Sequence, residues 1–206
     1  DHWRKLGELL GKPIFPIQHP RGLNGLIADQ DALPNWRARW CTRILKIEPY
    51  RAYLMAATRQ YDSVVSYVGL RADEELRAGG IFSDIPGVVS RHPMREWGWS
   101  LGNVWACLEK WGVEIPRRTD CARCFFQRLP EWWLLWNDHP AIYEDAARQE
   151  RVISARRGKP CTYRSPSRDT WPASLDDMRV RFAAGDVPRG IKNGALVGKQ
   201  CRTCSL

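Results

Sequence analysis

The sequence lacks a long apolar segment. No run approaches the ~20 consecutive apolar residues that a membrane-spanning helix needs, and the first residues, Asp1-His2-Trp3-Arg4-Lys5, lack the apolar core of a signal peptide. No internal repeat is present. These absences argue against a helical membrane protein and against an exported one. We therefore expect a cytoplasmic protein with no membrane partner.

Composition and charge indicate a globular protein with an anionic partner. The chain has 206 residues, of which 44% are hydrophobic, including 11 tryptophans, so it can bury a core. One domain fits this length better than two, and a domain followed by a tail is the alternative. Its 32 Lys and Arg residues against 23 Asp and Glu give a net charge of +9. This charge favours a nucleotide, a sulfate ester or a nucleic-acid backbone without choosing among them.

The cysteines favour metal or redox chemistry over a disulfide framework. There are seven of them, an odd number, and they include two Cys-x-x-Cys pairs in a chain without an export signal. Cys121 and Cys124 follow a loop and are predicted to open an aromatic helix, whose amides would lower the pKa of a thiol. The pair could be a redox dithiol, or half of a zinc site that Cys201 and Cys204 complete.

Two segments predict β-strands. Ser63–Leu70 is β-branched and mostly apolar, which fits a strand buried in a parallel sheet, and Pro13–Gln18 fits a shorter strand. We expect an α/β fold with a mainly parallel central sheet flanked by helices and a helical C-terminal region. Residues 1–138 would form the α/β domain, and residues 139–206 a helical extension with a Cys-x-x-Cys tail. Helices are predicted over residues 3–11, 50–57, 101–111, 125–136 and 140–153, with a last one capped by Ser174 and Asp177.

The stretch from Trp40 to Tyr50 is the strongest candidate for an anion site. It sets Cys41, Arg43 and Lys46 immediately ahead of a predicted helical run. A thiolate, positive charge and a helix N-terminus could converge there on a phosphate or sulfate. The alternative is a solvated basic face whose tryptophans pack inward.

Arg71 is a second candidate for anion binding. It directly follows the predicted strand Ser63–Leu70, at the carboxyl edge where open α/β sheets bind ligands. The alternative is an ion pair between Arg71 and Asp73 or Glu74.

Four motifs together resemble the phosphoadenosine phosphosulfate (PAPS) reductase family, within the adenine-nucleotide α-hydrolase-like (PP-loop) superfamily. The stretch around Lys46 and Pro49 resembles its Cys-Cys-x-x-(Arg)-Lys-x-x-Pro-Leu signature, with Cys41 on the first cysteine and Thr42 in place of the second. The resemblance spans roughly residues 36–126 and is nearest to the shorter, phage-type members. The other motifs follow in the family's order: Gly69-Leu70-Arg71, then Trp97 with Val104-Trp105, then Cys121-x-x-Cys124.

The resemblance implies a sulfonucleotide-binding protein with a metal centre. Arg43, Lys46 and Arg71 would bind an adenylylated or sulfated nucleotide. Cys41, Cys121 and Cys124 would hold a [4Fe–4S] cluster, with zinc as the alternative. The fourth ligand would be Cys161 or a cysteine of the C-terminal pair, with Cys204 as our choice. In a reductase, Cys201 and Cys204 would supply the attacking thiolate.

The chain also departs from the family. The Ser-Gly-Gly-x-Asp-Ser nucleotide loop is not found, so the chain is a fragment, or the loop is absent or supplied by another chain. Gln200-Cys201-Arg202-Thr203-Cys204 stands where reductases carry Glu-Cys-Gly-Leu-His. Two alternatives stay open: an enzyme subunit that thiolates tRNA or the DNA backbone, and a non-catalytic zinc module that binds nucleic acid. Residues 190–198 are expected to form a flexible arm.

Overall fold

The computed structural model describes residues 2–77, 82–115, 121–166 and 169–196. The chain divides into two compact units. The described part of unit 1 comprises residues 2–19, 43–77 and 82–115, and that of unit 2 comprises residues 20–42, 121–166 and 169–196. No helix in the described ranges is both long and apolar enough to cross a membrane.

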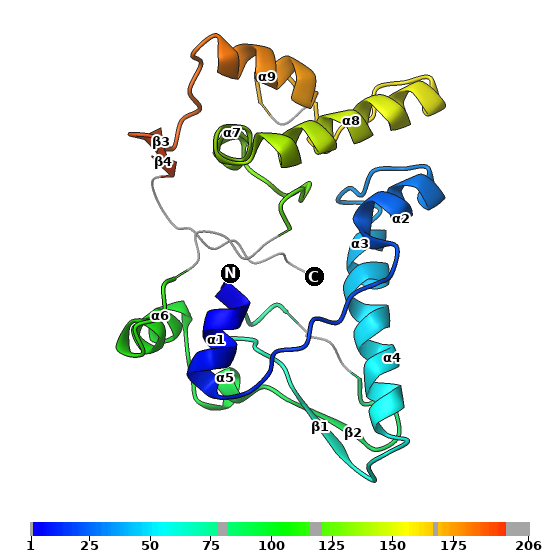
Figure 1. Ribbon diagram of the computed structural model, residues 1–206, viewed down its shortest axis with the longest axis vertical. Coiled ribbons are helices and arrows are strands. Elements are labelled where there is room, and N and C mark those ends of the chain that lie inside the picture. Colours follow the sequence, from blue (N-terminus) through cyan, green and yellow to red (C-terminus); the bar gives the residue numbers. More distant parts are fainter. Residues whose placement is uncertain (1, 78–81, 116–120, 167–168, 197–206) are drawn as a thin grey trace. The chain divides into compact units, whose positions relative to one another are not determined.

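Unit 1 combines helices with a parallel pair of strands. β1 (Val64–Tyr67) pairs in parallel with β2 (Val88–Arg91), with Val64 opposite Val88 and Tyr67 opposite Arg91 (Figure 1). β1 confirms a strand within the predicted segment, whereas residues 13–18 form no strand. The apolar core consists of Leu54, Phe82, Ile85 and Val88. The helices are α1 (His2–Leu10), η1 (Arg43–Ile47), α4 (Glu48–Ala57), α5 (Pro93–Glu96) and α6 (Leu101–Lys110).

Residues 40–57 are helical without a break, and their middle turn is the π-helix η1. Pro49 explains the irregular turn, because it has no N–H to bond the carbonyl of Leu45 in an α-helix. The helix begins at Trp40, so the prediction that Cys41, Arg43 and Lys46 precede the helical run is wrong. Cys41 lies in its first turn, and both cations lie within the π-helical turn.

Unit 2 is built around three helices that pack in series. α7 (Leu129–Asp138) packs on α8 (Pro140–Arg157), and α8 packs on α9 (Leu175–Ala183) (Figure 1). Their core includes the fully buried side chains of Trp132 and Met178. Because α7 and α8 share this core, unit 2 extends across the domain boundary predicted between residues 138 and 139. The unit also contains α2 (Gly22–Gln30), α3 (Trp40–Thr42), β3 (Ile191–Lys192) and β4 (Ala195–Leu196).

The C-terminal half of unit 2 follows local sequence signals. Ser174 accepts the backbone N–H of Asp177 at 3.4 Å, which confirms the predicted cap of α9. β3 and β4 form an antiparallel hairpin around Asn193 and Gly194, both with positive φ. Asn-Gly is the preferred dipeptide for such a turn. Residues 191–196 therefore form a hairpin that contacts α7, where a flexible arm was predicted.

The described residues form a mixed helix and strand protein with a small parallel sheet. This architecture is compatible with the predicted α/β class. The larger central sheet of the adenine-nucleotide α-hydrolase-like fold stays a prediction.

Candidate functional site

In unit 1, Arg71 lies in an ordered loop at the carboxyl end of β1. Its Nε donates to Asp73 Oδ1 at 2.8 Å, and its Nη1 lies 3.4 Å from Glu74 Oε2. The side chain is 14% exposed. The alternative of an ion pair with Asp73 or Glu74 is therefore realised, and both carboxylates share the same guanidinium. The role of Arg71 in nucleotide binding stays a prediction.

Buried polar contacts fix this loop in place. Glu74 is buried, accepts the backbone N–H of Arg71 at 3.0 Å and forms an ion pair with Arg77. Arg95 donates to the carbonyl oxygens of Arg71 and Glu74, the second at 2.6 Å. Asp73 accepts the first amide of α6, from Leu101, at 3.2 Å. Three guanidinium groups thus face two carboxylates, and with the exposed Glu75 of the same loop the positive and negative charges balance.

The titration of Asp73 fits this arrangement. Desolvation raises the pKa of Asp73, but the Leu101 amide and the Arg71 guanidinium outweigh it and hold the pKa below its usual value. The carboxylate therefore stays charged and keeps Arg71 oriented at neutral pH.

The other two predicted nucleotide-binding cations lie on η1. Arg43 and Lys46 are both exposed. Arg43 forms an ion pair with Glu48, and no acidic residue in the described part of the chain pairs with Lys46. Arg43, Lys46 and Arg71 all belong to unit 1. Their convergence on one anion stays a prediction.

The predicted metal ligands in the described ranges all belong to unit 2. Cys41 is on α3, Cys121 and Cys124 are in a turn, and Cys161 follows α8. Cys41 and Cys161 both pack against the aromatic core. The amide of Cys124 donates to the carbonyl of Cys121 at 3.1 Å, and α7 begins only at Leu129. The prediction that the cysteine pair opens a helix is therefore wrong.

These cysteines do not form a ready-made metal site. Within residues 2–77, 82–115, 121–166 and 169–196, no three His, Cys, Asp or Glu side chains lie close enough together to hold a metal ion. The proposed fourth ligand Cys204, and Cys201 beside it, lie outside the described residues. The described cysteines alone do not form such a site, and metal binding, with Cys161 or Cys204 as the fourth ligand, stays a prediction.

Tyr163 is buried within electrostatic range of Cys41. Desolvation raises the pKa of Tyr163, Arg123 lowers it, and electrostatic interactions with Glu150, Asp145 and Cys41 raise it further. Its hydroxyl is buried and has no hydrogen-bond partner among the described residues. Buried hydroxyls are ordinarily paired, so this one is an exception among the described contacts.

Glu150 has the most strongly shifted carboxyl group of unit 2. Desolvation raises its pKa to about 8, although two backbone amides favour the charged form. Its two oxygens accept the N–H groups of Tyr163 and Leu175, each at 2.8 Å. A shifted pKa is a signal of a functional site. Here both oxygens are already used by the backbone, which indicates a structural role.

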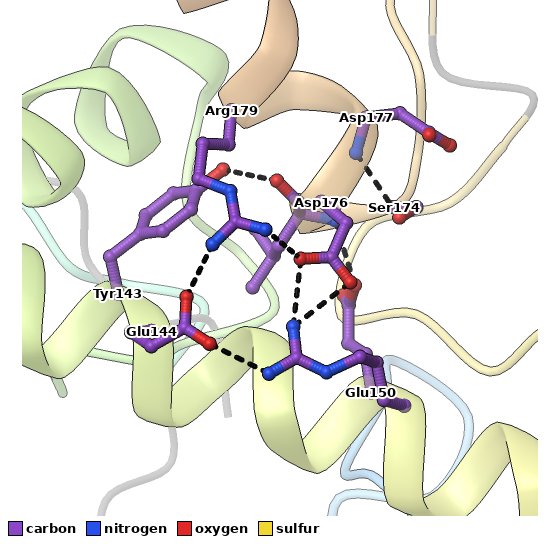
Figure 2. Close-up of polar contacts among 9 residues, drawn as sticks. Tyr143, Glu144, Glu150, Ser174, Asp176, Asp177 and Arg179 are labelled. Carbon is purple, nitrogen blue, oxygen red and sulfur yellow. Dashed lines mark hydrogen bonds and ion pairs between the residues drawn. The ribbon is translucent and has the colours of Figure 1, made fainter.

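Charged pairs surround Glu150 at the junction of α8 and α9. Figure 2 shows Glu144 of α8 and Asp176 of α9 bridged by two arginines. Arg151 contacts Asp176 at 2.8 Å, and Arg179 contacts Glu144 at 2.5 Å. These groups are partly exposed, so each pair contributes little on its own. Their number and their crossing between helices indicate that they fix the register of α9 on α8.

Comparisons with protein-family models, with curated proteins and with solved structures find no match to this chain. The resemblance to the PAPS reductase family therefore stays a prediction from the order of the chain's own motifs. Arg95 and Glu150 were missed by reasoning from the sequence. Both lie in helical segments where an isolated charge usually faces solvent, and no local signal distinguishes them.

Proposed function

We propose that the protein binds an adenylylated or sulfated nucleotide through unit 1 and acts in sulfur transfer or reduction. The observation that carries this proposal is the loop at the carboxyl end of β1, which places Arg71 at that edge. Parallel strands bind ligands at this edge, and hydrogen bonds with Glu74 and Arg95 fix the backbone of Arg71 there. The order of the four motifs gives the proposal its substrate class.

The three cations would share the anionic groups of the nucleotide. Nε and Nη1 of Arg71 face carboxylates, and no described residue bonds its Nη2, which is therefore open to a ligand oxygen. Lys46 has no acidic partner in the described ranges, so it would bind a phosphate or sulfate without first breaking an ion pair. Arg43 would have to exchange Glu48 for the ligand.

The cysteine tail would carry out the reductive version of the chemistry. The thiolate of Cys201 attacks the sulfuryl sulfur, the bond from that sulfur to the phosphate oxygen breaks, and the nucleotide leaves with the oxygen. Cys204 then attacks the sulfur of Cys201, which releases sulfite and forms a disulfide. The two electrons come from the two thiols, and an external dithiol restores them.

Lys46→Gln is expected to weaken sulfonucleotide binding about tenfold, because a charge-assisted hydrogen bond to a phosphate or sulfate contributes ~1.5–3 kcal/mol. Isothermal titration of the full chain with PAPS, adenylyl sulfate and ATP measures it. Lys110→Gln is the matched control, since Lys110 is exposed at the end of α6 in the same unit, and it should leave the affinity unchanged. Equal affinity of the wild type and the Lys46 variant would remove Lys46 from the site. Binding of nucleic acid alone would reject the proposed function.

A further inference from the structure

Unit 2 contains a pocket whose walls include one candidate metal ligand, Cys161, and no other predicted site residue. Its volume is about 640 Å³, within the range of small-molecule sites. Three stretches far apart in the sequence form its walls: residues 32–36, Phe125 with Phe126, and the end of α8 together with residues 159–166.

The walls are aromatic and cationic. Trp36 and Phe126 offer ring surface, and Trp36 is 62% exposed. Arg157 and Lys159 supply positive charge, whereas Arg164 is buried and forms an ion pair with Asp169. No acidic side chain is among the lining residues that the structure describes. Arg157 is held by the carbonyl oxygen of Asp31 at 2.6 Å. The exposed Lys159 has no acidic partner in the described ranges.

Further cations lie over the aromatic rings of this pocket. The guanidinium of Arg37 lies 4.7 Å from the ring of Trp36, and that of Arg39 lies 5.4 Å from the ring of Phe126. Positive charge therefore continues from the pocket along residues 37–39. An extended anion would meet several cations in succession there, whereas a small one would meet only those inside.

Two buried polar atoms of the lining residues lack a partner in the described part of the chain. They are the hydroxyl oxygen of Tyr163 and the Nε of Arg164, in side chains that are 3% and 1% exposed. Orphaned polar groups of this kind are rare in folded proteins. Both atoms lie behind the surface of the pocket wall, so they do not face its contents directly.

We propose that this pocket binds an unpaired nucleotide of a single-stranded nucleic acid. The base stacks on Trp36 and Phe126, and its phosphate lies at Lys159 and Arg157. The neighbouring phosphates follow Arg37 and Arg39. Aromatic side chains reach a base face only where the base is unpaired, so a duplex cannot use the pocket. The net charge of +9 suits a polyanion better than a single nucleotide. The inference does not depend on the sulfonucleotide site of unit 1.

Fluorescence anisotropy with a labelled ten-nucleotide single strand tests the proposal on the full chain. Trp36→Ala should weaken binding roughly tenfold through the loss of one stacked base. Lys159→Gln should lower the slope of log K against log salt by about 0.7 through the loss of one phosphate contact. Trp111→Ala and Lys110→Gln are the matched controls in unit 1, since Trp111 is 63% exposed, and both should bind as the wild type does.

Three outcomes would overturn the proposal. One is an unchanged affinity of the Trp36→Ala variant for the oligonucleotide. Its thermal melting should match that of the wild type, because the Trp36 side chain is exposed. Another is a duplex of the same sequence that binds the wild type as tightly as the single strand does and loses the same affinity in the Trp36→Ala variant. The last is competition by adenosine or uridine monophosphate at the concentration of the oligonucleotide, which would assign the pocket to free nucleotides. Lys46→Gln, which tests the unit 1 site, should leave oligonucleotide binding unchanged, so the two proposals can fail separately.

Discussion

Glu150→Ala is expected to lower the free energy of unfolding of the protein by about 3 kcal/mol or more. The substitution leaves the buried amides of Tyr163 and Leu175 without acceptors, and each such loss costs ~1–3 kcal/mol. It also opens a cavity beside the core of unit 2. Urea unfolding followed by tryptophan fluorescence measures the effect. Glu144→Ala is the control on the same helix, since its ion pairs are half exposed and its loss should cost less than about 1 kcal/mol. Equal losses in the two variants would contradict the structural role of Glu150.

The raised pKa of Glu150 also predicts how the stability of the protein depends on pH. Desolvation raises the pKa of Glu150 to about 8 in the folded chain, above its usual value of 4.5. Between these two pH values the folded state holds a proton that the unfolded state has released. Stability from Glu150 is therefore fully present below pH 4.5 and is lost as the pH rises through 8, by up to about 1.4 kcal/mol per pH unit.

The variant Glu150→Gln isolates the pH-dependent contribution of Glu150 to stability, because its side-chain amide keeps one acceptor oxygen and cannot ionise. The difference in unfolding free energy between the wild type and this variant should fall between pH 5 and pH 8. A difference that is constant over this range would show that Glu150 is already ionised in the folded protein.

Replacing Cys201 and Cys204 together with serine is expected to abolish sulfonucleotide reduction, by roughly a thousandfold or more, because removal of a nucleophile eliminates the covalent route. Metal content and unfolding free energy should stay at the wild-type values. Cys107→Ser is the control, since Cys107 lies half-buried in α6 and has no assigned role.

The opposite result would assign the tail to the metal centre. Loss of metal together with loss of stability would show that at least one of these cysteines is a ligand, as Cys204 was expected to be. It would also reject the tail as the nucleophile. Iron, zinc and acid-labile sulfide measured on anaerobically purified protein distinguish the two results and identify the metal.

Local sequence signals predicted the elements whose causes are local. The cap at Ser174 and the strand within Ser63–Leu70 were found because a side chain or a β-branched run determines them. The start of α7 was placed too early, because aromatic residues suggested a helix from Phe125. The helix begins at Leu129, with Pro130 in its first turn, where proline is favoured.

Features that depend on distant segments could not be predicted. The nucleotide pocket draws its walls from residues 32–36, 125–126 and 159–166, and no spacing rule connects them. The burial of Glu150 depends on amides that come 13 and 25 residues later in the chain. The segment 13–18 was taken for a strand from its apolar residues, but no neighbouring strand pairs with it among the described residues. Isolated strands have no ladder to satisfy their backbone groups.

The most direct test of the account is the release of sulfite from a sulfonucleotide. The full chain, purified without oxygen, would be incubated with PAPS or adenylyl sulfate and a dithiol, and sulfite and the product nucleotide would be measured together. The account predicts both products in equal amounts, lost in the Cys201 and Cys204 double variant and reduced in Lys46→Gln. An intact sulfonucleotide that neither binds nor reacts with the folded wild-type protein would contradict it.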